Sequence, residues 1–372
     1  MLLRKEIRRR YEKLAANVRT ISMGLTRDRQ NFIEEPYLND SELRQAYLLY
    51  YTTTNMLKII PPLRELSFSG FFDTSKPLRI LDLGSGTGAA IWGLLQYLEC
   101  ERALPIEVSI TAVDSVAKNL STVRDFHNRL SKRCKFVSSS LEVQLDNLEH
   151  TKLHRSEERY DLIIMMNTLN ELSLEAEQAL YDLFKQLLED DGVLMLIEPA
   201  SRPQSRRLLS FRDEAVKTGF TIYAPCTRHA NCPALDREGN WCHTEYDWER
   251  PEFIKLIDEF AETLRLSLKS TYITINKNGK TLSGSLQAKN MISRVVSERF
   301  DEKGRTRAIL CSEKGRGEYT LNKRDKSDSN KAFTNVERYD LLSLSNAESR
   351  EHDSLIAEAS SVEIVLQNSG AR

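Results

Sequence analysis

Leu81-Asp82-Leu83-Gly84-Ser85-Gly86-Thr87-Gly88 is the stretch that decides the fold class of this 372-residue chain. An apolar strand pattern from Arg79 to Leu83 leads into it, and an apolar helix pattern from Ala89 to Leu98 follows it. Three glycines at alternate positions let the backbone turn sharply and approach a ligand closely, and the helix behind them presents free N–H groups. The stretch therefore predicts a strand, a cofactor-binding loop and a helix, in that order.

The glycine spacing indicates which cofactor this loop binds. Gly-x-Gly-x-Gly differs from the Gly-x-Gly-x-x-Gly of nicotinamide enzymes, and the Gly-Lys-Ser/Thr ending of a phosphate loop is absent. The next strand pattern ends at Asp114, where an acidic side chain accepts both ribose hydroxyls of an adenosyl ligand. Asp82 is expected to hold the loop or to face the cofactor's ammonium group. We predict an S-adenosylmethionine site at Asp82, Gly84, Gly86, Gly88 and Asp114; the alternative is a tight turn in a fold that has lost its ligand.

Short apolar strands alternate with amphipathic helices beyond this loop, which predicts an α/β fold with a Rossmann-like class I methyltransferase sheet. The expected strands cover residues 79–83, 109–113, 134–138, 161–166 and 193–198. The clearest helix lies between the last two, with Ser173 as its expected N-cap and Gly192 as its expected stop.

The fourth strand ends in Met165-Met166-Asn167-Thr168-Leu169-Asn170-Glu171, at the edge where such sheets present residues to an acceptor. We predict that Asn167 contacts the cofactor or the acceptor, the alternative being a turn or cap role. The Asn-Pro-Pro-Tyr-like sequence common in enzymes that methylate amino groups on bases is absent. The sequence thus supports cofactor binding better than methyl transfer, and it leaves the catalytic residue unassigned.

The remaining sequence divides into regions of different character. Residues 1–75 read as helical, with Asn39 or Asp40 as a cap, and residues 76–220 form the S-adenosylmethionine-binding Rossmann-like domain. Residues 221–326 are expected to form a metal-cluster and small β unit, with a helix over 251–269, strands over 271–276, 292–299 and 305–310, and hairpin signals at Asn278-Gly279 and Glu302-Lys303-Gly304. Residues 327–372 are expected to be an acidic, partly mobile tail.

Six cysteines are present, and they fall into two groups. Cys100 and Cys134 lie on helix and strand patterns, where a small buried hydrophobic residue is expected. The other four, Cys226, Cys232, Cys242 and Cys311, lie in a turn-rich segment or at a strand end. A reducing compartment disfavours disulfides, so these four predict a thiolate metal site, holding zinc or an iron–sulfur cluster, rather than unpaired cysteines. His229 and His243 are backup ligands.

Charge and hydropathy limit the classes of partner that this chain is expected to bind. No apolar run is long enough to span a bilayer and no secretory signal opens the chain, so we expect a cytoplasmic protein without a membrane partner. Residues 1–30 carry nine Lys/Arg against three Asp/Glu, and residues 303–326 carry eight against three, whereas the tail reverses to four against eight. The basic stretches indicate a surface for a polyanion, the alternative being solvated faces. Additional phosphate contacts are expected from Arg202, Arg206, Arg207 and Arg212.

Together these motifs resemble the methyltransferase-like small-ribosomal-subunit assembly family, which occurs in mitochondria and has bacterial relatives. The resemblance covers roughly residues 35–325. It rests on the glycine loop, Leu169-Asn170-Glu171-Leu172, Glu198-Pro199, and the block Pro225-Cys226 to Cys232-Pro233 to Trp241-Cys242-His243. Ala200 departs from the glycine that the family tends to have after Glu198-Pro199, and the acidic tail is not explained by the resemblance.

What the resemblance implies is a four-iron four-sulfur cluster on Cys226, Cys232, Cys242 and Cys311, a cofactor loop at Gly84, Gly86 and Gly88, and action on the small ribosomal subunit during its maturation. It also implies the mitochondrial matrix if the source is eukaryotic. The leading hypothesis is therefore an rRNA-facing assembly or translation factor whose methyl transfer is active or vestigial, with no DNA partner. The alternatives are a conventional methyltransferase of a small molecule or protein with a structural zinc site, and a binding module that transfers nothing.

Overall fold

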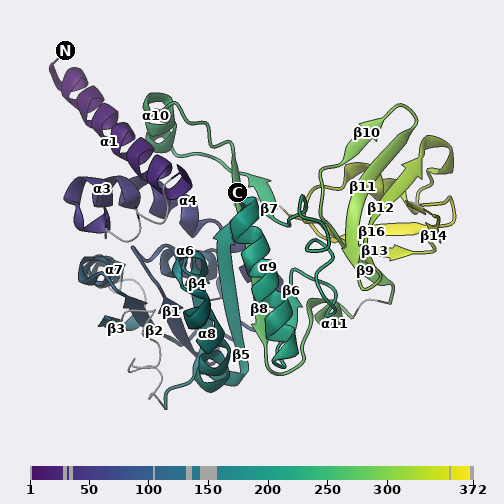
Figure 1. Ribbon diagram of the computed structural model, residues 1–372, viewed down its shortest axis with the longest axis horizontal. Coiled ribbons are helices and arrows are strands. Elements are labelled where there is room, and N and C mark those ends of the chain that lie inside the picture. Colours follow the sequence, from purple (N-terminus) through teal and green to yellow (C-terminus); the bar gives the residue numbers. More distant parts are fainter. Residues whose placement is uncertain are drawn as a thin grey trace.

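The computed structural model describes residues 2–27, 32, 37–103, 105–130, 136–142, 157–287, 289–351 and 353–368. Within these residues the chain forms two eight-stranded sheets that lie side by side (Figure 1). The first sheet has the order β3-β2-β1-β4-β5-β8-β6, with β7 paired to β8. Its strands are β1 (Pro77–Leu83), β2 (Glu107–Asp114), β3 (Phe136–Glu142), β4 (Tyr160–Met166), β5 (Leu188–Pro199), β6 (Thr221–Ala224), β7 (Thr244–Asp247) and β8 (Ser267–Asn276).

Strands β1 to β5 run parallel to one another, whereas β8 runs antiparallel to β5, β6 and β7. The strand order reverses between β1 and β4, which is where ligands bind in open parallel sheets. This arrangement is the Rossmann-like class I methyltransferase sheet, so the predicted fold class is confirmed.

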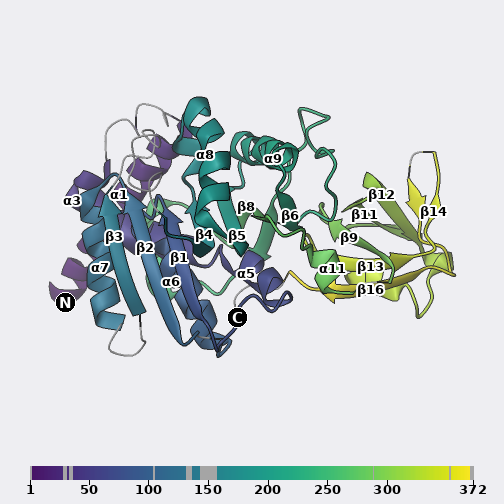
Figure 2. The ribbon, with the colours of Figure 1, turned by 90° about the horizontal axis from the view of Figure 1, so that it is seen from below.

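Helices cover both faces of the first sheet (Figure 2). Alternate strand residues pack on opposite sides because side chains of a strand alternate in direction. Ile80 and Ile164 belong to the core shared with α5 (Ile60–Ser67) and α6 (Ala89–Cys100), together with α7 (Ala117–Leu130). Leu81 and Ile163 belong to the core shared with α8 (Leu174–Leu187) and α9 (Arg202–Lys217).

The N-terminal helices form a third core with a helix from much later in the chain. The helix α4 (Thr53–Met56) contacts α6 instead. The helices of the third core are α1 (Leu2–Arg27), α3 (Ser41–Ala46) and η2 (Tyr47–Thr52), with the short η1 (Tyr37–Asn39) between α1 and α3. Their apolar faces pack against α10 (Glu252–Ala261), which lies beside α1 (Figure 1). Asp40 caps α3, as predicted, by accepting hydrogen bonds from Glu42 N and Leu43 N at 2.8 and 2.9 Å.

The second sheet has the order β14-β15-β12-β11-β9-β13-β16, with β10 paired to β11. Its strands are β9 (Met291–Val295), β10 (Phe300–Glu302), β11 (Arg305–Ser312), β12 (Gly315–Asn322), β13 (Leu341–Ser345), β14 (Glu348–Ser349), β15 (Ser354–Leu355) and β16 (Ser361–Leu366). It is preceded by α11 (Leu282–Ser285) and carries the turns η6 (Lys323–Asp325) and η7 (Lys331–Asn335). The predicted hairpin at Lys303-Gly304 is confirmed, since Glu302 pairs with Arg305 across it.

Several predicted helices and strands differ from those in the structure. Ser173 is the N-cap of α8, as predicted. Gly192 does not stop this helix, because α8 already ends at Leu187 and Gly192 lies within β5, which begins at the next residue. The helix expected over 251–269 ends at Ala261, and the strand expected over 271–276 belongs to the first sheet as β8, so no hairpin forms at Asn278-Gly279. Cys100 is exposed, and Cys134 lies outside the described residues.

The acidic tail differs most from expectation. Its described residues, 327–351 and 353–368, supply β13 to β16, and Leu342, Leu344 and Val362 are buried in the core of the second sheet. The alternation of these apolar residues with polar ones outweighs the acidic composition. Among the described residues, no helix combines the length and apolarity needed to cross a bilayer.

Candidate cofactor and cysteine sites

The glycine loop connects the carboxyl end of β1 to α6. Gly84 N and Ser85 N both donate to Val113 O, at 2.8 and 2.9 Å, which fixes the loop against the end of β2. Gly88 is the N-cap of α6 and has a φ of 82°. The backbone of the loop is thus held by the two strands at the point where the sheet order reverses.

Glycine is needed at two positions of this loop for two different physical reasons. Gly84 has a φ of 72°, and a Cβ there would overlap the Thr168 side chain, so the β4 loop packs directly on its backbone. Gly86 has a φ of 52°, yet a Cβ there would meet no described atom within 4 Å. Gly86 therefore faces open space, as expected of backbone that a ligand approaches closely.

Asp114 lies against the same loop. Its Oδ2 accepts a hydrogen bond from Gly86 N at 2.7 Å, and its Oδ1 accepts from Val116 N at 2.8 Å and Asn119 Nδ2 at 3.0 Å. The structure thus brings Asp114 and Gly86 into direct contact. Asn119, which the sequence analysis missed, orients this carboxylate.

Asp82 is the most unusual polar residue of the site. Its side chain is 1% exposed, and neither carboxylate oxygen has a hydrogen-bond partner among the described residues. Burial first, and the nearby Asp114 charge second, raise the pKa of Asp82 to about 8. Two buried acceptors without donors are costly, so this position suits a cationic donor.

The loop after β4 is held by a buried carboxylate at the end of β5. Asn167 has a φ of 60°, and its backbone N–H donates to Ile197 O at 2.8 Å. Glu198 accepts from Leu169 N at 2.9 Å and from Asn170 Nδ2. The role of Glu198 was not predicted from the sequence, although an acid that closes an apolar strand was the available signal.

The N-terminal helices also reach the loop. Thr52 Oγ1, at the end of η2, lies 2.5 Å from Thr87 Oγ1, and both residues are buried. The sequence offered no signal for this contact, because the two threonines are ordinary helix and loop residues. The helical region is therefore part of the wall of the candidate cofactor site.

The four cysteines of the second group line one cavity together. Burial, then the Cys226 and Cys242 charges, raise the pKa of Cys311 to about 12, and the same three causes raise the pKa of Cys232. Negative charge on Cys226 or Cys242 therefore opposes ionisation of Cys232 and Cys311, which line the same cavity. Cys311, far away in the sequence, is therefore brought to the other three.

This cavity does not have the geometry of a formed metal site. No group of three or more His, Cys, Asp or Glu side chains in the described part of the chain is arranged to hold a metal ion. The donor chemistry nevertheless fits one, because four cysteines line the cavity and the Arg316 charge, in the same wall, lowers the pKa of Cys311 and so favours its thiolate. The backup ligands His229 and His243 are not among the described residues that line it.

Arginines of α9 hold the cysteine segment. Arg206 donates to the backbone carbonyls of Ala234, Leu235, Arg237 and Asn240 at 2.9 to 3.2 Å. The predicted phosphate contacts are wrong for this side chain, since a guanidinium satisfies the carbonyls of a loop that lacks secondary structure.

Two further α9 arginines are also committed to the protein itself. Arg212 is fully buried and donates to the carbonyls of Arg228 and Ala230. Arg207 pairs with Glu177 at 2.8 Å. Neither guanidinium is therefore available for the phosphate contacts that the sequence predicted.

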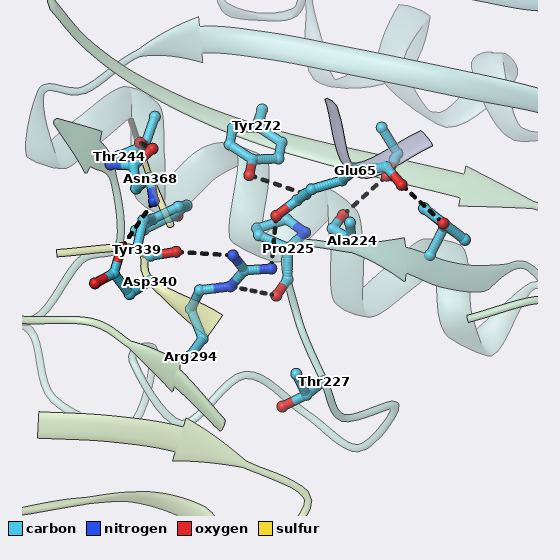
Figure 3. A network of polar contacts seen from close by, with 12 residues as sticks. Glu65, Ala224, Pro225, Thr227, Thr244, Tyr272, Arg294, Tyr339, Asp340 and Asn368 are labelled. Atoms are coloured by element: carbon cyan, nitrogen blue, oxygen red, sulfur yellow. Dashed lines mark hydrogen bonds and ion pairs between the residues drawn. The ribbon is translucent and has the colours of Figure 1, made fainter. Parts of the chain in front are cut away.

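A buried polar network joins the cysteine cavity to both sheets (Figure 3). Arg294 on β9 pairs with Glu65 on α5 at 2.6 Å and donates to the carbonyls of Pro225 and Tyr339 at 3.1 and 2.8 Å. Tyr272 OH on β8 donates to Glu65 at 3.0 Å. Arg294 is thus a link between the N-terminal helices, the cysteine segment and the second sheet.

Solved structures similar to this chain are methyltransferases with low overall likeness. They include a precorrin-6y C5,15-methyltransferase from Geobacter metallireducens GS-15, with 13% identity, a TM-score of 0.34, and coverage of 57% of this chain and 87% of that one. A putative sarcosine dimethylglycine methyltransferase from Galdieria sulphuraria has 16% identity and a TM-score of 0.34, with 66% and 91% covered. No curated protein matches the chain.

The family comparison covers most of the molecule. The family model described as mitochondrial small ribosomal subunit Rsm22 matches residues 44–340, a span that includes the glycine loop and all four cysteines of the cavity. With this match over more than half of its length, the chain belongs to the mitochondrial small ribosomal subunit Rsm22 family.

Proposed function

We propose that this chain is an S-adenosylmethionine-binding, methyltransferase-like protein that acts on the small ribosomal subunit as an rRNA-facing assembly or translation factor. The observation that carries the cofactor is the pair of unpartnered Asp82 oxygens at the end of β1, beside a loop that opens at Gly86. Asp82 would face the cofactor's ammonium group, and Asp114 would take its ribose hydroxyls. Asn167 is proposed as a further contact.

The bound cofactor would supply an activated methyl group, and the chain's own residues would fix its position. Glu198 would hold the β4 loop, and Thr168 would pack that loop on Gly84. The proposal assigns no catalytic residue, so it concerns cofactor binding and leaves the methyl acceptor unnamed.

The ribosomal partner is supported by the family and by the basic stretches at 1–30 and 303–326. Part of that charge is already paired within the protein, as in the contacts of Arg305 and Arg307 with Glu302. The remaining cations would release counterions on meeting phosphate. For a eukaryotic source we propose the mitochondrial matrix as the compartment, and the cytoplasm for a bacterial one.

We also propose that Cys226, Cys232, Cys242 and Cys311 hold a four-iron four-sulfur cluster that cross-links the cysteine segment to β11. The support is the convergence of four thiols on one cavity with arginines in its wall. Zinc is the alternative occupant, because four thiolates also suit a tetrahedral ion.

Co-sedimentation of the full-length protein with small ribosomal subunits at two salt concentrations tests the function. We expect binding at low salt that weakens steeply at the higher concentration. Absence of co-sedimentation at low salt, with S-adenosylmethionine binding intact, would favour the conventional methyltransferase of a small molecule or protein.

The cluster has its own test. After anaerobic purification, we expect iron and sulfide in equal amounts, together with an absorbance band from thiolate-to-iron charge transfer. Cys311→Ser should lose the band, whereas Cys100→Ser, at an exposed cysteine outside the cavity, should keep it. If the protein contains one equivalent of zinc and no sulfide, the site is a zinc site and not a cluster. If Cys311→Ser retains all of its iron, Cys311 is not a ligand.

A further inference from the structure

A second cavity, of about 470 Å³, lies at the opposite end of the first sheet from the glycine loop. Pro77, Leu78 and Arg79 at the start of β1 line it, whereas the glycine loop follows the end of the same strand at Leu83. Its volume is in the range of about 300 to 1,000 Å³ that is usual for ligand pockets. Nothing in the proposed cofactor or cysteine chemistry uses it.

A buried side chain in its wall lacks a partner. Asn276, the last residue of β8, is 1% exposed and lines the cavity. Its Nδ2 donates to Lys280 O at 2.9 Å, which fixes the orientation of the amide. Its Oδ1 has no hydrogen-bond partner among the described residues, so the wall presents a buried acceptor that requires an N–H or O–H donor.

The charge of the lining is negative. Five carboxylates line the cavity against three cations, which leaves an excess of two negative charges: Asp73, Asp161, Glu189, Asp190 and Asp191 against Lys76, Arg79 and Lys280. The cations are used internally, since Arg79 pairs with Asp161 and Glu189 and Lys280 pairs with Asp191. The side chain of Asp190 is fully exposed, and its Oδ1 lies 3.6 Å from Lys277 Nζ.

The floor of the cavity is apolar. Leu66, Phe71, Phe72 and Tyr223 line it, and the two phenylalanine rings pack edge to face with centroids 5.2 Å apart. Such a floor suits the methylene stem of a lysine or arginine, whose charged end then meets the carboxylates at the rim. An aliphatic neighbour of that side chain would bury apolar surface on the same floor.

We propose that this cavity binds a basic, extended peptide segment of a protein partner, with one N–H group donating to Asn276 Oδ1. Phosphate is disfavoured because it would meet the negative rim, so RNA contacts belong to other faces of the molecule. A peptide fits better than a free polyamine because it offers amide donors and apolar side chains together. The inference stands apart from the cofactor, the cluster and the ribosomal partner.

The test uses the full-length protein and a fluorescein-labelled nine-residue peptide that alternates arginine with leucine, followed by fluorescence anisotropy. Asn276→Leu should weaken binding at least tenfold, because the buried N–H donor of the peptide loses its acceptor. Asp190→Lys, at an exposed position that does not support the fold, should weaken it three- to tenfold. Asp328→Lys makes the same charge change on an exposed side chain far along the chain and should change affinity less than twofold.

Folding and specificity are checked together. Each variant should keep the wild-type thermal unfolding temperature, and a peptide that alternates glutamate with leucine should not bind. Equal weakening by Asp190→Lys and Asp328→Lys would overturn the site, since it would show attraction to overall charge. Displacement of the peptide by spermine at equal concentration, lost in Asn276→Leu, would overturn the peptide as ligand and assign the cavity to a free polyamine.

Discussion

At the scale of single residues, Asp82 links the fold to the cofactor. Its folded pKa of about 8 lies above the ordinary value of 3.8, so the folded chain keeps a proton that the unfolded chain releases. The stability from this group is therefore complete below pH 4 and is lost as the pH rises toward 8. A cationic ligand reverses the effect, because it favours the carboxylate.

This linkage predicts a pH-dependent cofactor affinity. Between pH 6 and 7.5 the affinity for S-adenosylmethionine should rise by up to about tenfold per pH unit, since Asp82 must lose its proton to pair with the ammonium group. Asp82→Asn should bind more weakly and with little dependence on pH. Calorimetry across this range measures both, and a wild-type affinity independent of pH would contradict the pairing.

The loop glycine gives a second residue-scale prediction. Gly86→Val should weaken S-adenosylmethionine binding at least tenfold, because the side chain would enter the open space beside the loop. Gly304→Val is the matched control, since Gly304 also has a positive φ, 87°, and open space but lies in the second sheet. If the two variants lose similar thermal stability but only Gly86→Val loses cofactor affinity, the assignment of Gly86 to the cofactor site is supported. Equal cofactor affinities in the two variants would remove that assignment.

At the scale of elements, the sequence predicted the parts that local patterns specify. The glycine loop, the parallel strands, the Ser173 and Asp40 caps and the Lys303-Gly304 hairpin all follow from periodicity and turn chemistry. The placement of β8 did not, because an alternating strand pattern does not reveal which sheet edge it joins. Composition also misled at the tail, where the acidic residues, most of which lie outside β13 and β16, concealed the buried Leu342 and Val362 of these strands.

In the candidate cofactor and cysteine sites, too, local patterns were predictable from the sequence and long-range contacts were not. Asp114 lies beside the glycines and Cys311 lies in the cysteine cavity, as motif and resemblance suggested, while the ligands assigned to them stay predictions. Long-range partners such as Thr52 and Thr87 had no sequence signal. Arg206, Arg207 and Arg212 were misassigned because a row of cations has the same appearance whether it faces phosphate or neighbouring groups of the protein, whereas the prediction for the exposed Arg202 stays untested.

These arginines give an element-scale prediction. Arg206→Met should lower the stability of the cysteine segment by about 1 to 3 kcal/mol, because several backbone carbonyls lose their donor. Arg202→Met, at the exposed start of the same helix, should change it little. Thermal unfolding and iron content after purification measure the difference. Equal behaviour of the two variants would contradict the structural role of Arg206.

At the scale of the whole molecule, the two sheets are joined by one apolar cluster that includes Ile80, Ile292 and Leu341, and by buried polar contacts. Glu65 comes from α5, Tyr272 from β8 of the first sheet, and Arg294 from β9 of the second (Figure 3). Burial raises the pKa of Glu65, and the Arg294 guanidinium opposes that rise. The pair therefore depends on both sheets being docked, and docking also places Cys311 at the cavity.

Removing one member of this pair should uncouple the two sheets. Arg294→Met leaves Glu65 buried without its cation, a change that typically costs about 3 to 5 kcal/mol. We expect calorimetric unfolding to change from one transition to two and the iron content to fall. Arg305→Met, which breaks the half-exposed pair with Glu302, should cost less than about 1 kcal/mol and keep one transition.

The double variant Glu65→Leu/Arg294→Met separates charge from packing. It removes both buried charges, so it should recover a large part of the stability and restore a single transition, because an apolar pair avoids the desolvation penalty. It should recover less of the iron content, since the Pro225 carbonyl beside Cys226 still lacks the Arg294 donor. If the double variant unfolds as early as Arg294→Met, the sheets are joined by packing at Tyr339 and Leu341, and the ion pair is not what couples them.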